Sequence, residues 1–301
     1  MEESADVRGA MAQAGSIGSP AGGFAFSTLG SPCASVSDIV RIARDAGCRG
    51  LEVRSAAGEA VHADLTSADA LEIRDQLAGA AFTVLAITSY VGLCAPLAQD
   101  GSDEQLEDLV AQVGLAGRIG AAGVRVFMRD TSAPSSEGPS DGERLALRRL
   151  SAVAELCDQW GVSVLVETHD THSLGTKISA FCALLDAELP GHRCGVIWDA
   201  AHSWAQGESP ADTLRLLRPW LAYVQIKDVR SRESPVPVMP GEGSYPIDDL
   251  AVAIENSGWR GWVSLEWERM WHPELPSVVV ALTETRIWAS RLIGGMETGK
   301  P

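Results

Sequence analysis

The sequence predicts a single α/β domain in which eight parallel strands close into a (β/α)8 barrel. Three observations support this fold class. From about residue 23, short β-type runs alternate with longer helical patterns, and the count reaches eight of each. No GxGxxG or Walker motif follows any of these strands, which disfavours the alternative of an open, doubly wound sheet. The length of 301 residues suits one barrel of this kind.

The first four strand–helix units occupy the first half of the barrel. Apolar runs rich in Val, Leu, Ile and Phe predict strands at 23–27, 50–54, 82–87 and 124–128. Helical periodicity predicts helices at 37–46, 67–78, 103–119 and 142–160. The first of these helices carries Ile39, Val40 and Ala43 on one face, and Gly47 is its stop signal.

The second half repeats the alternation. Strands are predicted at 162–167, 194–199, 222–226 and 262–266, and helices at 177–187, 210–217, 247–257 and 277–292. Two connections that follow strands are long and polar, at 131–142 and at 229–246, and the second contains Gly241-Glu242-Gly243. Loops that follow the strands of a barrel lie over its active face. These two loops therefore either contact the substrate as lids or are surface loops without a role in binding.

The domain organisation follows from the same reading. We expect residues 1–22 to be a disordered leader, 23–293 to be the catalytic barrel and 294–301 to be a flexible tail. The leader has neither a basic segment nor an apolar core, so it does not resemble a secretory signal. No run of about 20 apolar residues is present to span a membrane. The six cysteines form no CxxC pair, and we expect buried free thiols in a cytoplasmic protein.

The charge excludes one class of partner. The formal net charge is -16, from 40 acidic and 24 basic residues, and no basic run is present. A nucleic-acid-binding protein needs a basic face to neutralise phosphates, so we expect a small-molecule substrate instead. The sequence leaves open whether the chain forms a homo-oligomer.

A polar residue lies at or near the end of each of the last four predicted strands, after an apolar run. These residues are Glu167, Asp199, Gln225 and Glu266. Side chains alternate between the interior of a barrel and its helix layer, so all four can point inward while their apolar neighbours pack outward. The carboxyl ends of the strands form the active face of such a barrel, where the four side chains would meet.

Three carboxylates gathered in one place repel each other and are costly to bury. One bound divalent cation would remove this cost. If the amide of Gln225 binds through its oxygen, all four ligands are oxygens, and this set favours Mn²⁺ or Mg²⁺ over Zn²⁺. The alternative is that the carboxylates form ion pairs with inward arginines such as Arg54 or Arg129.

Several basic residues are candidates for binding the substrate. His202 follows Asp199 by three residues, within reach of a ligand at the cation, although an isolated histidine is often only a surface or hydrogen-bonding residue. The further candidates are His169, Arg54, Lys227 and Arg230. Trp271 could wall a sugar pocket or could pack in the outer layer.

These strand ends also resemble a known family. The strings Val166-Glu167-Thr168-His169, Trp198-Asp199-Ala200-Ala201-His202, Gln225-Ile226-Lys227-Asp228, Gly241-Glu242-Gly243 and Ser264-Leu265-Glu266-Trp267-Glu268 are similar to those of sugar phosphate isomerase/epimerase proteins of the xylose-isomerase-like TIM-barrel superfamily. The segment 266–274, which includes Trp271-His272-Pro273, also resembles a recurrent form within the family. The resemblance covers about residues 23–292.

The resemblance implies a site and a reaction. Glu167, Asp199, Gln225 and Glu266 would hold one divalent metal ion, Glu167 and Glu266 would also be the acid/base pair, and His202 would contact the substrate. Many members have histidine in place of Gln225, whereas members resembling hydroxypyruvate isomerase have glutamine there. The implied activity is isomerisation or epimerisation of a sugar, keto-sugar or related polyol or hydroxy-keto acid through an enediolate.

Three alternatives to this activity remain. The same scaffold supports a metal-dependent lyase or dehydratase that acts on a keto-sugar, an inosose or a dehydroshikimate-like substrate. A nuclease similar to endonuclease IV shares the barrel, but it needs many histidine ligands and a basic face that this acidic chain lacks. A sugar-binding barrel without catalysis would bind metal but exchange no proton.

Overall fold

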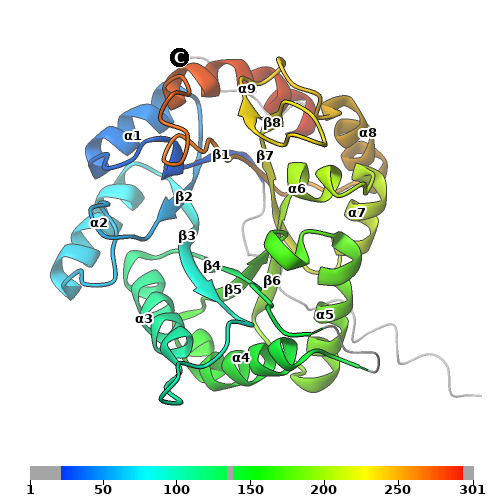
Figure 1. Ribbon diagram of the computed structural model, residues 1–301. Helices are drawn as coiled ribbons and strands as arrows, with labels where there is room; N and C mark the ends of the chain where they lie inside the picture. Colours follow the sequence, from blue (N-terminus) through cyan, green and yellow to red (C-terminus); the bar gives the residue numbers. More distant parts are fainter. Residues whose placement is uncertain (1–21, 134–137, 294–301) are drawn as a thin grey trace, which may run out of the picture.

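The computed structural model describes residues 22–133 and 138–293. Its core is a closed barrel of eight parallel strands in the order β1-β10-β7-β6-β5-β4-β3-β2, and a ring of helices surrounds it (Figure 1). The (β/α)8 fold predicted from the alternation of elements is therefore confirmed. The leader predicted at 1–22 and the tail predicted at 294–301 lie outside the described residues, except for Gly22, whose amide donates to the Arg260 carbonyl oxygen.

The eight barrel strands lie close to their predicted positions. They are β1 (Phe24–Ser27), β2 (Gly50–Arg54), β3 (Thr83–Gly92), β4 (Gly123–Phe127), β5 (Ser163–Glu167), β6 (Cys194–Asp199), β7 (Leu221–Ile226) and β10 (Trp262–Leu265). The largest difference is β3, which continues five residues beyond the predicted end at residue 87. The register against β4 shifts between Thr88 and Gly92, and this irregularity carries Tyr90 over the mouth of the barrel.

The principal helices also match the predicted pattern. They are α1 (Val36–Asp45), α2 (Ser67–Gly79), α3 (Glu104–Ile119), α4 (Asp141–Trp160), α5 (Gly175–Glu188), α7 (Pro210–Leu217), α8 (Ile247–Ser257) and α9 (Val278–Ile293). Local chemistry sets their ends. Ser140 and Glu143 form a reciprocal capping box at the start of α4, and Gly161 ends it in the left-handed conformation, with φ 66°.

Some short elements were not predicted. Two short helices, η2 (Thr28–Gly30) and η3 (Asp170–His172), follow β1 and β5, and α6 (Ala200–Ala205) follows β6 directly. The long connection after β7 contains a small antiparallel pair, β8 (Asp228–Val229) and β9 (Pro237–Val238). All five elements follow the carboxyl ends of strands, so they shape the mouth of the barrel.

Side chains of the strands divide into two layers, as the alternation predicted. The inner cluster includes Ala25, Leu85, Leu165, Ile197, Tyr223 and Trp262, which fill the lower part of the barrel. Val164, Val166, Trp198, Val224 and Ile226 belong instead to the large cluster between the strands and the helices. Because Glu167, Asp199 and Gln225 lie two residues beyond inner-layer positions, they point inward at the mouth.

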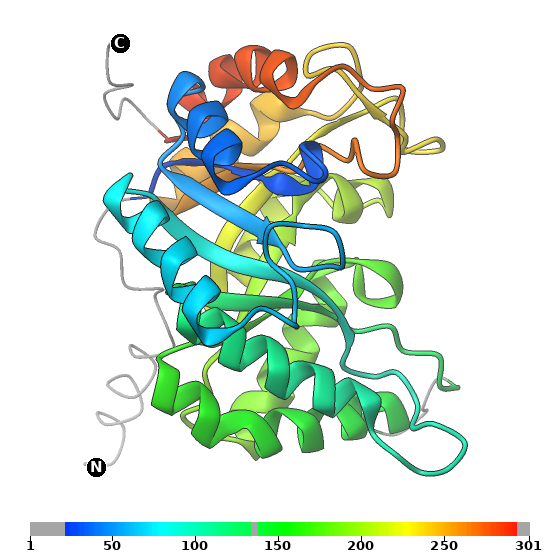
Figure 2. The same ribbon diagram turned by 90° about the vertical axis from the view of Figure 1, so that its left-hand side faces the viewer.

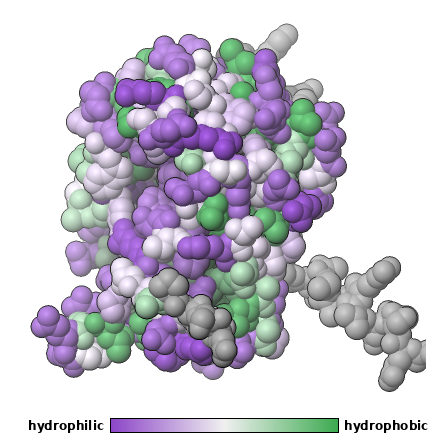
Figure 3. Space-filling model, turned by 45° about the vertical axis from the view of Figure 1, so that its right-hand side comes forward, coloured by the Kyte–Doolittle hydropathy of each residue, from purple (hydrophilic) through white to green (hydrophobic). Residues whose placement is uncertain are grey.

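The loops at the carboxyl ends of the strands gather on one side of the barrel. In Figure 2 the hairpin of β8 and β9 and the segment that joins β10 to α9 both lie on this side. The face shown in Figure 3 is mostly hydrophilic, and hydrophobic residues occur there in separate groups. None of the helices within 22–133 and 138–293 is long and apolar enough to cross a membrane. All six cysteines fall in these ranges and are free thiols.

Candidate active site

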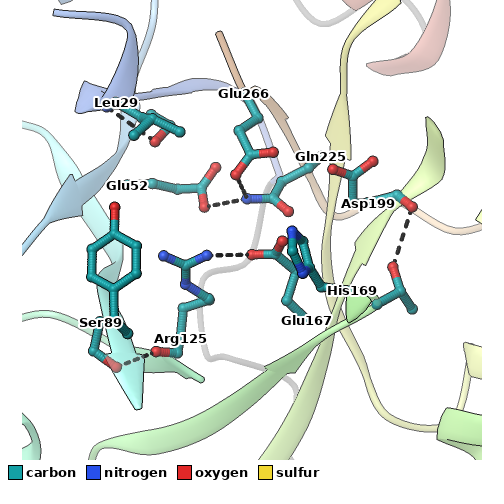
Figure 4. Close-up of polar contacts among 12 residues, drawn as sticks. Leu29, Glu52, Ser89, Arg125, Glu167, His169, Asp199, Gln225 and Glu266 are labelled. Carbon is teal, nitrogen blue, oxygen red and sulfur yellow. Dashed lines mark hydrogen bonds and ion pairs between the residues drawn. The ribbon is translucent and has the colours of Figure 1, made fainter. Parts of the chain in front are cut away.

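Three buried carboxylates meet at the mouth of the barrel. Glu167 ends β5, Asp199 ends β6 and Glu266 follows β10, and each offers an oxygen within 4.8 Å of an oxygen of the other two. Gln225, on β7, lies between the strands of Asp199 and Glu266 in the barrel. The structure therefore brings together the four residues that the strand ends predicted (Figure 4).

Asp199 is fixed by the helix that follows it. Its Oδ1 accepts hydrogen bonds from the backbone amides of Ala201 (2.9 Å) and His202 (3.2 Å), so Asp199 is the N-cap of α6. A helix N-terminus carries partial positive charge and stabilises this carboxylate. With Oδ1 held in this way, Oδ2 is the oxygen that faces the cluster.

Glu167 is fixed by a buried arginine. Arg125, on β4, donates from Nη1 to Glu167 Oε2 at 2.9 Å, and both side chains are almost fully buried. The other oxygen, Oε1, has no hydrogen-bond partner among the described residues. A buried carboxylate oxygen without a partner is costly, so this atom is positioned for a cation or a proton.

Lys227 provides a positive charge at the centre of the cluster. Its Nζ lies 2.7 Å from Asp199 Oδ2 and 2.8 Å from Glu266 Oε2, and it also contacts Glu268. The side chain is 2% exposed, so water screens these contacts weakly. The ammonium therefore contacts two of the predicted metal ligands directly, and a divalent cation would share or replace these contacts.

The carboxyl groups titrate differently because their surroundings differ. Burial raises the pKa of Glu167 to about 8, although the charge of Arg125 opposes this shift. Burial also raises the pKa of Asp199 to about 6, against the effect of Lys227. Burial acts on Glu266 too, but the charge and hydrogen bond of Lys227 outweigh it and hold the pKa of Glu266 below its usual range.

The donor set fits a divalent cation. Glu167 Oε1 and Gln225 Oε1 are both buried without a hydrogen-bond partner in the described part of the chain. Together with Asp199 and Glu266 they would form a set of oxygen ligands, as Mn²⁺ and Mg²⁺ prefer. A second group, Glu167 with His169 and His202, also has ligand atoms within 4.8 Å of one another. Nitrogen ligands from this group would suit Zn²⁺.

The rings of two histidines pack edge to face beside the carboxylates. The rings of His169 and His202 are 4.6 Å apart, and His169 packs against Phe127 at 4.5 Å. His202 Nδ1 lies 3.0 Å from the backbone oxygen of Thr168, which orients the ring. Desolvation lowers the pKa of His202 to about 3, so this ring is neutral at pH 7. Both histidines are partly exposed, so a bound molecule can reach them.

Arginines and aromatic rings line the opposite side of the mouth. Arg54 lies 5.4 Å from the ring centroid of Tyr90 and 5.5 Å from that of Trp271, and its Nε donates to Tyr90 Oη at 2.8 Å. Arg125 lies 4.0 Å from the ring centroid of Phe127. Because Trp271 follows β10 and Tyr90 lies on β3, the last loop of the barrel reaches across to the strands of the first half.

The remaining predicted residues differ in whether they contact the carboxylate cluster. Lys227, His169 and His202 contact the cluster or one another, and Arg54 lies at its edge. Arg230 is exposed after β8, and no hydrogen bond or ion pair connects its side chain to the cluster within the described residues. We therefore find no contact that supports a role of Arg230 at this site.

The predicted alternative, in which arginines pair with the carboxylates, holds for a different arginine. Arg54 pairs with Glu59, and Arg129 lies 3.7 Å from Asp170, so neither contacts the three strand-end carboxylates. Arg125 makes the pair with Glu167 instead. One ion pair with an arginine therefore coexists with the cation-binding geometry.

The Gly-Glu-Gly motif has a structural role. Asp228 Oδ2 accepts hydrogen bonds from the amides of Gly241 and Gly243, each at 2.9 Å, and its Oδ1 accepts from Tyr245 at 3.1 Å. A Cβ on Gly243 would lie 2.2 Å from Asp228 Oδ1, so only glycine fits there. The motif therefore folds the connection after β7 back onto Asp228 and keeps it beside the mouth.

Sequence reasoning missed three inward-facing strand residues that hold the carboxylate and amide groups in place. Arg125 and Tyr223 lie at inward positions of β4 and β7, and Glu52 lies at an inward position of β2. Parity on β2 places Glu52 inward together with Arg54, but an inward direction alone indicates no role. The same parity, applied to β4 and β7, would have found the other two. The partner that each residue contacts lies on a different strand, which parity cannot show.

Two known proteins are similar in sequence to part of this chain. A protein of Streptomyces coelicolor assigned as a hydroxypyruvate isomerase is 28% identical over 137 residues, which is 43% of this chain and 47% of that protein. The chain thus matches about half the length of this relative. The 3-dehydroshikimate dehydratase of Bacillus anthracis is 23% identical over 199 residues, 66% of this chain and 68% of that protein.

Solved structures share the fold at lower identity. D-psicose 3-epimerase from Clostridium cellulolyticum H10 superposes with a TM-score of 0.69 at 12% identity, over 90% of this chain and 99% of that one. A structure of the IolI protein with bound zinc also has a TM-score of 0.69, at 13% identity, over 90% of this chain and 98% of that one. These likenesses show the barrel alone.

The family is decided by a match over most of the barrel. A family model described as a xylose isomerase-like TIM barrel matches residues 40–284. These residues run from α1 to α9 and include every strand-end residue of the carboxylate cluster. The chain therefore belongs to the xylose isomerase-like TIM-barrel family.

Proposed function

We propose that the protein is a divalent-metal-dependent isomerase or epimerase of a sugar, keto-sugar or related polyol or hydroxy-keto acid. The observation that carries this proposal is the convergence of Glu167 and Glu266. They come from strands that β6 and β7 separate, yet their oxygens lie within 4.8 Å of one another beside Asp199 and Gln225. Such a pair can act on both sides of a small substrate.

Glu167, Asp199, Gln225 and Glu266 would hold one divalent metal ion. A cation bound there, Mn²⁺ or Mg²⁺ by the oxygen donors, would polarise the carbonyl group of the substrate and stabilise negative charge on its oxygen. One glutamate then takes the proton from the carbon next to the carbonyl, and an enediolate results. The other glutamate returns a proton, to the opposite face for epimerisation or to the neighbouring carbon for isomerisation.

The surrounding side chains would hold the substrate. His202 and His169 lie on one side of the cluster, and Lys227 contacts Asp199, Glu266 and Glu268 within it. Arg54 lies with Tyr90 and Trp271 on the other side, where it would bind hydroxyl or carboxylate groups. A carbohydrate-like molecule with adjacent hydroxyl and carbonyl groups fits this arrangement. The substrate is thus a small molecule, and a cytoplasmic location stays a prediction from the sequence.

A second reaction is supported by one relative. The match to 3-dehydroshikimate dehydratase covers 66% of this chain, more than the match to the hydroxypyruvate isomerase. A dehydratase would use the same proton removal and would then expel a hydroxyl group from the next carbon. His169 would protonate that leaving group, because its ring faces the cluster, whereas the neutral ring of His202 would only form a hydrogen bond.

The test is deuterium exchange measured by mass spectrometry. The protein is dialysed against a chelator, and one portion is reloaded with Mn²⁺. Both forms are incubated in D₂O with a panel of ketoses, keto acids and inososes. We expect the Mn²⁺ form to place deuterium on one substrate of the panel without loss of mass, and we expect the chelated form to place none.

The other outcomes separate the alternatives. Loss of water from a substrate would establish the dehydratase reaction in place of isomerisation. Exchange that is equal in both forms would contradict metal dependence. Bound Mn²⁺ with no exchange and no product across the panel would contradict the acid/base proposal and favour a barrel that only binds its ligand. An exposed glutamate outside the site, Glu284 on α9, provides the control variant Glu284→Gln.

A further inference from the structure

We propose that Glu52 is a positioning residue that holds Gln225 with its carbonyl oxygen toward the cation, and so makes an amide an oxygen ligand. This inference rests on the metal site of the proposed function. Glu52 lies on β2, on the far side of β1 and β10 from Gln225, and it is 0% exposed. It would contact neither the cation nor the substrate, but it would determine which atom of Gln225 the cation meets.

The contact between Glu52 and Gln225 crosses the barrel interior. Gln225 Nε2 donates to Glu52 Oε2 at 2.8 Å and lies 3.4 Å from Glu266 Oε1 (Figure 4). The two hydrogens of the amide nitrogen thus have two carboxylate oxygens as acceptors. Gln225 Oε1 is buried and has no hydrogen-bond partner among the described residues.

The chemistry of the amide decides its orientation. Carboxylate oxygens and amide oxygens both accept hydrogen bonds. If the amide oxygen of Gln225 lay beside Glu52 and Glu266, three acceptor oxygens would face one another without a donor between them. Only the NH₂ group can lie between the two carboxyl groups. The carbonyl oxygen must then point away from them, into the space that Glu167 and Asp199 border.

Glu52 is itself held in place. Tyr223 Oη donates to Glu52 Oε2 at 2.8 Å, and Ser264 Oγ bonds to Glu52 Oε1. The pairing with Gln225 does not depend on the charge of Glu52, since Oε2 remains an acceptor when a proton is on Oε1. A buried carboxyl group lowers stability relative to an apolar residue of similar size. Its presence here therefore indicates that Glu52 holds other side chains of the site in place.

Glutamine needs such a partner more than histidine does. A neutral histidine ligand binds a metal through either ring nitrogen, and its other nitrogen finds a partner. The amide of a glutamine offers one ligand atom and one donor group, and a rotation of 180° exchanges them. Without Glu52, only the 3.4 Å contact with Glu266 would resist that rotation.

The experiment measures the affinity for Mn²⁺ by isothermal titration, without substrate. We expect Glu52→Met, which removes the acceptor for Gln225 Nε2, to weaken Mn²⁺ binding by about 10- to 100-fold, the usual effect of losing a group that orients a metal ligand. The conservative control is Glu52→Gln, which removes the charge but keeps an acceptor oxygen at the position of Oε2 for Gln225 Nε2. We expect this control to bind Mn²⁺ within about threefold of the wild type. Thermal unfolding confirms that each variant is folded.

The two single variants distinguish hydrogen bonding from charge. Glu52→Gln loses the charge of Glu52 but keeps an acceptor for Gln225 Nε2, whereas Glu52→Met loses both. A role through charge alone therefore predicts the same loss of affinity in both variants. In the double variant Glu52→Gln with Gln225→Glu, the amide on β2 donates to the carboxylate on β7, so an oxygen still faces the cation and we expect Mn²⁺ binding to be retained.

Each result has one meaning. A wild-type protein that binds no Mn²⁺ would overturn the proposed metal site. Mn²⁺ binding by the wild type together with equal binding by Glu52→Met would overturn only the role of Glu52. An equal loss in Glu52→Gln and Glu52→Met would also overturn it, since the residue would then act through its charge. Should Glu52→Met fail to fold, the folded double variant still tests the proposal by its affinity for Mn²⁺.

Discussion

The two halves of the barrel contribute opposite chemistry to the mouth. Strands β5, β6, β7 and β10 end in carboxyl and amide groups, which are Glu167, Asp199, Gln225 and Glu266. Strands β2, β3 and β4 bring arginines and aromatic rings, which are Arg54, Tyr90, Arg125 and Phe127. In the proposed function, the acidic half would hold the cation and move protons, and the basic and aromatic half would bind the polar substrate.

Two side chains cross from the basic half to the acidic half. Arg125 extends from the basic half to Glu167, and Glu52 extends from β2 to Gln225 on the acidic half. Both contacts are buried. The halves are therefore not independent, because each crossing residue fixes a group that belongs to the other side. Variants on each half should separate proton transfer from substrate binding.

The largest effect is expected on the acidic half. Glu167→Gln and Glu266→Gln should each lower kcat by about 1000-fold, because acid/base groups typically contribute 10²- to 10⁴-fold. The barrel should stay folded, since glutamine has nearly the same volume. Rates of deuterium exchange on the substrate measure the effect, with Glu284→Gln as the control. Near-normal exchange in both variants would exclude the proposed acid/base pair.

Lys227→Met should have the next largest effect. Removal of the ammonium leaves Asp199, Glu266 and Glu268 without their counterion, and breaking a buried pair in this way typically costs about 3–5 kcal/mol. We expect the metal-free variant to unfold at lower urea concentration than the wild type. Mn²⁺ should restore more stability to the variant than to the wild type, since the cation would replace the missing charge.

Lys177→Met is the control for this comparison, because Lys177 is exposed on α5. It should leave both urea midpoints unchanged. A Lys227→Met variant that is as stable as the wild type without metal would show that the carboxyl groups do not need the ammonium. Equal stabilisation of both proteins by Mn²⁺ would contradict competition between the ammonium and the cation.

The periodicity of the sequence predicted the fold and the acidic half of the site. Each strand that ends in Glu167, Asp199 or Gln225 has apolar neighbours of the opposite parity, so the inward direction was readable from the chain. The closure of the barrel then forces these ends together, whatever the details of the loops. The four strand-end residues could therefore be predicted, although their chemical roles stay a proposal.

The other half of the site could not be read in this way. The contact of Arg125 with Glu167 depends on register and rotamer, and Arg54 and Arg129 were equally reasonable partners from sequence. Tyr90 lies at the mouth because β3 extends past an irregularity in its register with β4, and nothing in the local pattern marks that extension. Trp271 reaches Tyr90 through the path of a loop, which periodicity does not describe.

The metal-free protein should lose stability as pH rises. Burial, together with the charge of Glu266, raises the pKa of Glu52 to about 8, and burial raises the pKa of Glu167 to about 8 as well. Between about pH 5 and pH 8 the folded protein keeps protons that the unfolded chain has released. Each such group therefore lowers the free energy of unfolding by at most about 1.4 kcal/mol per pH unit.

Urea unfolding in the presence of a chelator, at pH 5, 6, 7 and 8, measures this slope. Glu52→Gln removes one of the titrating groups, so its slope should be flatter than that of the wild type. Mn²⁺ should flatten the slope of the wild type too, because a bound cation favours the ionised carboxylates. A free energy of unfolding that rises with pH over this range would contradict the protonated, buried state of these groups.

The smallest effect is expected on the basic and aromatic half. Trp271 is 52% exposed and lies 5.5 Å from Arg54, beside the ring of Tyr90. An exposed contact between a cation and a ring contributes about 0.5–1 kcal/mol, so Trp271→Leu should raise KM by about two- to fivefold. The value of kcat and the affinity for Mn²⁺ should not change, because the acidic half is intact. Trp160→Leu, at the end of α4 and also exposed, is the control. A fall in kcat with unchanged KM would show instead that this loop takes part in the proton transfer, and the division of labour between the two halves would have to be abandoned.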